Sequence, residues 1–161
     1  MNIIFDCYNN EVQKRKIYIK ELKKCNDRKE ELHGMYLGGA NQFGEYIKGG
    51  KSINPTEDAL SGYVDAVNYK TYIKLEGQEY SLNDYIKKLN KLIKEQNRYI
   101  KEISNVLSKI EGREAELFYL IKVKGYKPTK AVTEISIKYD ITENNIWRRE
   151  YRKIKKYLKN I

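Results

Sequence analysis

The chain has 161 residues, a formal net charge of +10 and a sequence pI of about 9.4, so it can bury a core in one domain or two small ones. No stretch approaches the roughly 18 uninterrupted apolar residues of a membrane span, and the N-terminus lacks the charge arrangement of a secretory signal. We therefore expect a cytoplasmic protein whose excess of cations favours phosphate-rich partners.

Residues 10–33 are predicted to form the first helix. Tyr18, Leu22 and Cys25 recur at helical spacing among charged residues. Cys25 is expected to act there as a small apolar residue. Residues 34–55 hold most of the glycines of the chain, and we expect a loop there.

Residues 55–70 are predicted to form a second helix. Asn54 suits the N-cap, and Pro55 suits the first helical position. Glu57 and Asp58 place negative charge in the first turn, where the helix dipole favours it.

Residues 71–82 have the pattern of a small β-hairpin. Ile73 and Leu75 alternate with polar or aromatic residues, and Gly77 stands where a tight turn is needed. The opposite face of the first strand is formed by Tyr72, Lys74 and Glu76.

Residues 82–110 carry the longest periodic pattern of the chain. Apolar residues and one glutamine follow a heptad repeat, and they are Ile86, Leu89, Ile93, Gln96, Ile100, Ile103, Leu107 and Ile110. The neighbouring g positions are also apolar, which widens the face beyond a two-stranded seam and favours a bundle. We expect this helix to pack against residues 10–33 and 55–70 of the same chain. The alternative is a homodimer through residues 82–110.

The last fifty residues are predicted to form three short helices, which begin after Glu111 and Gly112 break the heptad pattern. The first helix spans residues 113–124, and its expected core residues are Leu117, Leu120 and Ile121. Gly125 can end it, and Pro128 can begin the second helix.

The third helix begins after the turn Asp140–Thr142, with Thr142 as the expected N-cap. On a helical wheel its apolar residues share one face, and they are Ile146, Trp147, Tyr151, Ile154, Tyr157 and Leu158. The basic residues share the opposite face. This pattern is typical both of a DNA-reading helix and of an ordinary amphipathic helix with a solvated face. Trp147 is expected to lie in the core rather than on DNA.

The region from Gly125 to Asn160 resembles the helix-turn-helix of bacterial sigma factor region 4. Ile135, Tyr139, Ile141 and Ile146 stand where its two helices pack, and Ser136 stands where a small residue is required. Two positions depart from that family. Asp140 replaces the usual glycine, although Asp tolerates a left-handed conformation. Arg149 replaces an apolar residue, so the third helix is expected to be rotated relative to the family.

The whole layout resembles phage late-transcription regulators of the RinA and ArpU type. The resemblance implies a mainly α fold with a helical domain at 1–110, used for packing, oligomerisation or partner binding, and a helix-turn-helix domain at 111–161. It also implies a sequence-specific double-stranded DNA-binding transcription regulator acting with the RNA polymerase of a bacterial host. Two alternatives are a phage packaging or assembly protein that holds DNA non-specifically and an alternative sigma factor.

The expected DNA contacts lie at the start of the second helix and on the third. Arg and Asn side chains suit base edges, and Lys and further Arg side chains suit phosphates. Whether Arg148 or Arg149 faces the groove is left open. The full set is Lys127, Thr129, Lys130, Thr142, Glu143, Asn144, Asn145, Arg148, Arg149, Arg152, Lys155 and Lys156.

Catalysis, cofactors and metals are not expected. Cys7, Cys25 and His33 are the only Cys and His residues, which is too few for a zinc site or a disulfide framework. There is no phosphate-binding Gly-Lys loop and no recognisable nucleophile arrangement. Glu114 and Glu116 do not share a helix face.

Overall fold

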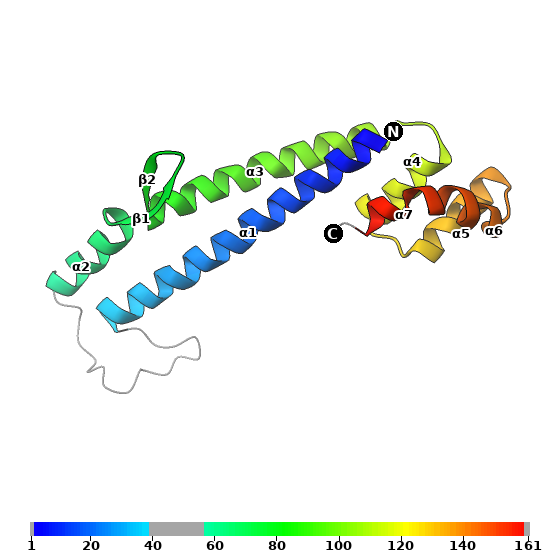
Figure 1. The fold of residues 1–161 in the computed structure, drawn as a ribbon. Helices are drawn as coiled ribbons and strands as arrows, with labels where there is room; N and C mark the ends of the chain where they lie inside the picture. The colour runs from blue at the N-terminus through cyan, green and yellow to red at the C-terminus, as the bar shows by residue number, and fades with distance from the viewer. Residues whose placement is uncertain (1, 39–56, 160–161) are drawn as a thin grey trace. The chain divides into compact units, whose positions relative to one another are not determined.

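The computed structural model describes residues 2–38 and 57–159. The protein is mainly helical with one two-stranded antiparallel hairpin (Figure 1), which confirms the predicted fold class. The chain forms two compact units: unit 1 contains Met1–Lys16 and Lys94–Ile161, and unit 2 contains Ile17–Ile93. The unit boundaries thus fall within two long helices, and they differ from the predicted boundary between residues 110 and 111.

The first helix, α1 (Asn2–Leu37), has 36 residues and exceeds the predicted range at both ends. The aromatic side chains of Phe5 and Tyr8, near its start, are buried in a core. This tertiary burial stabilises the first turns of α1, where the helix propensity of the residues is modest. The prediction of a loop from residue 34 was wrong for residues 34–37. The helix ends at Gly38, whose φ of 59° is a left-handed C-terminal conformation. The rest of the predicted loop lies outside the described residues, apart from Gly38 itself.

The second helix, α2 (Glu57–Asn68), carries Glu57 and Asp58 in its first turn, as predicted. The proposed cap at Asn54 and Pro55 lies outside the described residues. Strands β1 (Thr71–Leu75) and β2 (Gln78–Ser81) then pair antiparallel, which confirms the hairpin. Glu76 and Gly77 both have positive φ, at 50° and 77°. Two successive positive φ values match the twist of a two-residue hairpin turn.

Unit 2 has a core to which α1, α2 and the third long helix, α3 (Leu82–Leu107), all contribute. Within this unit, residues 82–93 pack against the α1 and α2 segments of the same chain, as predicted. Cys25 is buried, and burial raises the pKa of its thiol. The core residues are Cys25, Leu32, Ala66, Val67, Leu82, Tyr85 and Leu89.

The helix α3 ends at Leu107, so the predicted helical range to residue 110 was too long. The backbone N–H groups of Lys109 and Ile110 donate to the carbonyl oxygens of Val106 and Leu107, three residues back instead of the four of an α-helix. Gly112 then adopts a φ of 132°. Because this conformation strains other residues, Gly112 marks the break that the sequence predicted.

Unit 1 contains the remaining helical segments. They are α4 (Arg113–Phe118), η1 (Tyr119–Val123), α5 (Pro128–Tyr139), α6 (Glu143–Ile146), η2 (Trp147–Tyr151) and α7 (Arg152–Leu158). The segments η1 and η2 are π-helical turns. Segments α6, η2 and α7 follow one another without a break, and we call them together the C-terminal helix.

The core of unit 1 joins the start of α1 to the C-terminal segments. The rings of Phe5 and Phe118 stack with centroids 4.2 Å apart, and Tyr157 meets Phe5 edge-on at 5.4 Å. Leu117 and Leu120 are buried as predicted, and Ile121 packs against the same core. The first turns of α1 therefore belong to the same core as the C-terminal helix. No helix in the described part of the chain is long and apolar enough to cross a membrane.

Candidate nucleic-acid interface

The turn between α5 and the C-terminal helix is held by a short local network. Asp140 adopts the left-handed conformation, with φ and ψ of 50°, as its place in the sequence predicted. The N–H of Ile141 donates to the carbonyl oxygen of Ser136 at 3.1 Å. The Ser136 Oγ donates in return to the carbonyl oxygen of Ile141 at 2.6 Å. Ser136 is small, as the close approach of the helices requires, and its hydroxyl group also closes the turn.

The C-terminal helix begins at the predicted N-cap residue, but without the side-chain hydrogen bond typical of a threonine cap. Thr142 occupies the N-cap position, as predicted, but its side chain makes no capping hydrogen bond. Another threonine ties the helix to α5 instead, because the Thr133 Oγ1 donates to Glu143 Oε1 at 2.7 Å. Glu143, which was expected to face bases, is therefore engaged within the protein.

The packing between the two helices follows the prediction at three of four positions. Ile135 and Ile146 are fully buried, and Ile141 is half-buried. Tyr139 is instead 37% exposed, and its hydroxyl group donates to Glu116 Oε2 at 2.8 Å. The placement of Tyr139 between the helices was therefore wrong, and the residue links α5 to α4.

The C-terminal helix buries residues at steps of four through its π turn. Ile146, Glu150 and Ile154 are buried, and so is Tyr157. Four residues of a regular α-helix turn through about 400°, which would rotate each successive residue by about 40° around the axis. The wider turn at Trp147–Tyr151 compensates for this rotation. Arg149, where an apolar residue was expected, is exposed, and the buried residue is its neighbour Glu150.

Glu150 was not among the residues predicted to matter for this surface. Its side chain is 6% exposed, and its Oε1 lies 3.1 Å from the Nε of Arg113 at the start of α4. The Oε2 has no hydrogen-bond partner among the described atoms. The signal was present in the sequence, because a single acid lies on the apolar face of an otherwise basic helix.

All of the predicted DNA-contacting residues are exposed. They come from two places in unit 1, the start of α5 and the exposed face of the C-terminal helix. Arg148 and Arg149 are both exposed, so both guanidinium groups are accessible to a ligand. Lys130 lies over the ring of Tyr126, with its Nζ 3.9 Å from the centroid. Such a contact restrains the lysine while leaving its charge exposed.

Trp147 is half-buried rather than fully in the core. Its indole meets the ring of Tyr151 edge-on, with centroids 4.5 Å apart. Both residues pack against the core of unit 1, so the expectation of a packing role holds.

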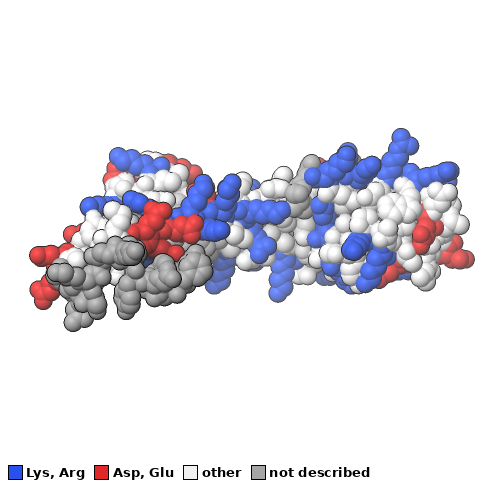
Figure 2. Space-filling view, turned by 90° about the horizontal axis from the view of Figure 1, so that it is seen from below, with Lys and Arg blue, Asp and Glu red and all other residues white. Residues whose placement is uncertain are grey.

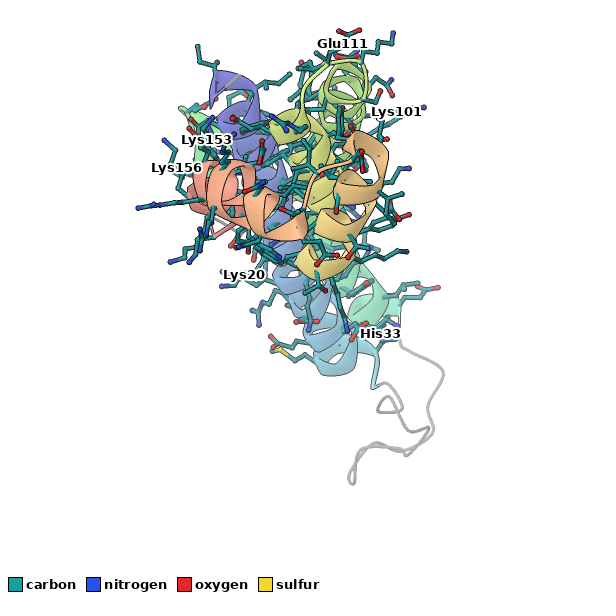
Figure 3. All side chains as sticks on the ribbon, turned by 90° about the vertical axis from the view of Figure 1, so that its right-hand side faces the viewer. Lys20, His33, Lys101, Glu111, Lys153 and Lys156 are labelled. Atoms are coloured by element: carbon teal, nitrogen blue, oxygen red, sulfur yellow. The ribbon has the colours of Figure 1, made fainter. Side chains whose placement is uncertain are left out.

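Basic side chains predominate on the part of the surface formed by α4 to α7 (Figure 2). Figure 3 shows Lys156 pointing away from the C-terminal helix, and its side chain is exposed. Lys153 is also exposed, and its Nζ is paired with Glu114 of α4 at 2.5 Å. The surface that the helix presents is therefore cationic, which suits a polyanion.

The end of the C-terminal helix is bonded by side chains from two other segments. The Asn9 Nδ2 of α1 donates to the carbonyl oxygen of Tyr157 at 2.8 Å. The Lys122 Nζ donates to the carbonyl oxygen of Leu158, also at 2.8 Å. Both acceptors are among the last carbonyl groups of a helix, which have no partners within it. Burial, together with the nearby charge of Lys16, lowers the pKa of Lys122.

No protein-family model matches the chain, and no match was found among curated proteins or solved structures.

Proposed function

We propose that the protein is a sequence-specific double-stranded DNA-binding transcription regulator. The observation that carries this proposal is the C-terminal helix, which follows α5 through a tight turn and exposes a continuous basic face. A helix in this arrangement can enter the major groove while the preceding helix lies across the DNA backbone. The proposal includes a phage origin and action with the RNA polymerase of the host.

The exposed residues of the first turns are assigned to the bases. Asn144 and Asn145 can make two-point contacts with adenine, and Arg148 and Arg149 can make them with guanine. Glu143 supports the helix start through its bond with Thr133. The Thr142 hydroxyl makes no capping bond, so it is available to a phosphate.

The remaining cations are assigned to phosphates. Arg152, Lys155 and Lys156 lie beyond the first turns of the C-terminal helix, where contacts position the protein without reading sequence. Lys127, Thr129 and Lys130 form the second group, at the start of α5.

The test is selection of bound sequences from a random pool of double-stranded DNA, repeated with Arg148→Ala and Lys155→Ala. One consensus should emerge for the wild type. Arg148→Ala should relax the preference at one position, whereas Lys155→Ala should weaken all sequences alike and lower the salt slope by about one. Recovery of no consensus would favour the packaging or assembly alternative. Binding indifferent to salt and to both substitutions would exclude the DNA interface.

Transcription assays separate a regulator from an alternative sigma factor. A regulator should change transcription only when the host polymerase carries its own sigma factor. Initiation by core polymerase and this protein alone would identify a sigma factor instead.

A further inference from the structure

A hollow of about 670 Å³ lies in unit 1 between the start of α4 and the C-terminal helix. Two short segments line it, Gly112–Glu114 and Arg148–Lys153. Every residue of these segments contributes to the lining except Tyr151. The lining contains five basic residues and two acidic ones, which is an excess of three positive charges (5 − 2).

The two acids of the hollow already have basic partners. Glu114 pairs with Lys153, and Glu150 pairs with Arg113. The other three cations are Arg148, Arg149 and Arg152, which are exposed and have no ion-pair partner within the described part of the chain. Three guanidinium groups without a counter-charge at one hollow call for an anionic ligand.

The chemistry of these groups selects a particular anion. A guanidinium group presents a planar fork of N–H donors, which matches the oxygens of phosphate in two-point contacts. The two ion pairs restrain the walls, because Arg113–Glu150 and Lys153–Glu114 each join α4 to the C-terminal helix. The hollow thus combines unpaired donors with walls whose separation is restrained.

We propose that this hollow binds a phosphate group, and that in the DNA complex the group is a backbone phosphate, held by Arg152 and by whichever of Arg148 and Arg149 does not contact a base. The choice of DNA as the source rests on the proposed function, whereas the phosphate chemistry of the hollow does not. The proposal adds Arg113 and Lys153, which lie outside the expected contact residues, as the paired cations that restrain the walls of the hollow.

The first test removes one positive charge from the hollow. Lys153→Gln is compared with Lys101→Gln, an exposed lysine of the same unit that does not line the hollow; both lysines are labelled in Figure 3. Affinity for double-stranded DNA is measured over a series of KCl concentrations. Lys153→Gln leaves the Glu114 carboxylate without its partner and lowers the net charge of the hollow by one. It should therefore weaken binding about threefold and reduce the salt slope by at most about 0.9, the value for one phosphate contact. Lys101→Gln should leave both unchanged, and equal effects of the two variants would overturn the proposal.

The second test adds charge instead of removing it. Glu114→Gln frees Lys153 and raises the net charge of the hollow, whereas Glu102→Gln makes the same change at an exposed pair with Arg98 on α3. Glu114→Gln should bind DNA about threefold more tightly with a steeper salt slope, and Glu102→Gln should not. If the Glu114–Lys153 pair only stabilised the fold, Glu114→Gln would not increase affinity, and this result would contradict the proposal.

A third measurement identifies the source of the phosphate. Inorganic phosphate and ATP are titrated separately into the wild type and the Lys153 variant without DNA, and binding is followed by calorimetry. Weak or absent binding of both, with the DNA effects above, supports a backbone phosphate. Saturable ATP binding that Lys153→Gln abolishes, with DNA affinity unaltered, assigns the hollow to a free ligand and overturns the backbone assignment. The same ATP result in a protein that binds no DNA would remove the proposed function and leave the phosphate site standing.

Discussion

Glu150 is a buried acid in the most basic segment of the chain, and its environment explains how it is tolerated. Its carboxylate meets Arg113 at 3.1 Å, while its second oxygen has no partner among the described atoms. A buried charge is costly unless it is paired, so the stability of this part of the core depends on Arg113. The pair also joins α4 to the inward face of the C-terminal helix, beside the buried side chains of Ile146 and Ile154.

We therefore expect Arg113→Ala to destabilise the protein by about 1–3 kcal/mol, because it leaves a buried acceptor without its partner. Urea unfolding measures the loss. Arg152→Ala, which removes an exposed guanidinium group from the neighbouring helix, should stay within about 0.5 kcal/mol of the wild type. Equal effects of the two substitutions would show that the Arg113–Glu150 pair does not stabilise the core.

Asp140 carries the left-handed turn on which the two-helix arrangement depends. A β-branched residue fits this conformation poorly, since its Cβ approaches the following carbonyl group. Asp140→Val should lower the free energy of unfolding by about 1–2 kcal/mol, whereas Asp140→Gly should cost little or nothing. Thermal unfolding of both variants is the measurement. A valine variant as stable as the glycine variant would mean that the turn relaxes to another conformation.

At the level of elements, the start of α1 and the C-terminal helix are coupled although they lie at opposite ends of the sequence. Phe5 stacks on Phe118 and meets Tyr157 edge-on. Asn9 bonds to the carbonyl oxygen of Tyr157, one of the last in the C-terminal helix. The candidate DNA-binding segment therefore depends on Phe5 and Asn9, and a fragment that begins at residue 111 would lack both.

Phe5→Ala should destabilise unit 1 by about 3–5 kcal/mol, the usual range for a buried phenylalanine, and should weaken DNA binding with it. Ile3→Ala, at a side chain 79% exposed on the same helix, provides the matched control and should change stability by about 0.5 kcal/mol or less. Circular dichroism during urea unfolding and a DNA-binding titration read out the two effects. Unchanged DNA affinity in a destabilised Phe5 variant would show that the coupling does not reach the interface.

For the whole molecule, the two units have separate cores and different chemical characters. Unit 1 holds the ion pairs between α4 and the C-terminal helix. The core of unit 2 contains the buried thiol of Cys25 and the buried ring of Tyr85, and the ring of Tyr72 lies 6.1 Å from that of Tyr85. Burial raises the pKa of each of these three groups, so the stability of unit 2 should respond to alkaline pH.

The direction of this pH dependence follows from the raised pKa of the Cys25 thiol. Its contribution to stability is complete below the pKa of an unfolded thiol, about 8.5. The contribution is lost as the pH rises through the pKa of the folded state. Between pH 7 and pH 9.5, under reducing conditions, the wild type should therefore lose more free energy of unfolding than Cys25→Ala. Parallel losses in the two proteins would show that this thiol does not control the alkaline response.

Periodicity and turn chemistry in the sequence were sufficient to predict the order of the helices, the hairpin and the left-handed turn at Asp140, but not the full extent of α1 or the end of α3. These are local features, because the spacing of apolar residues and the conformational preferences of Gly, Pro and Asp act within a few residues. The exposure of the basic residues on the C-terminal helix also followed from the helical wheel.

Tertiary structure alone decided the features that join distant segments. The pairing of Arg113 with Glu150, the docking of Phe5 on Phe118, and the bond from Thr133 to Glu143 all join residues on different segments. A regular wheel places Glu150 on the apolar face and Arg149 on the basic face, but it could not foresee the π turn at Trp147–Tyr151 or the partner of Glu150. These outcomes depend on which surfaces the packed core brings together, and no local pattern in the sequence carries that information.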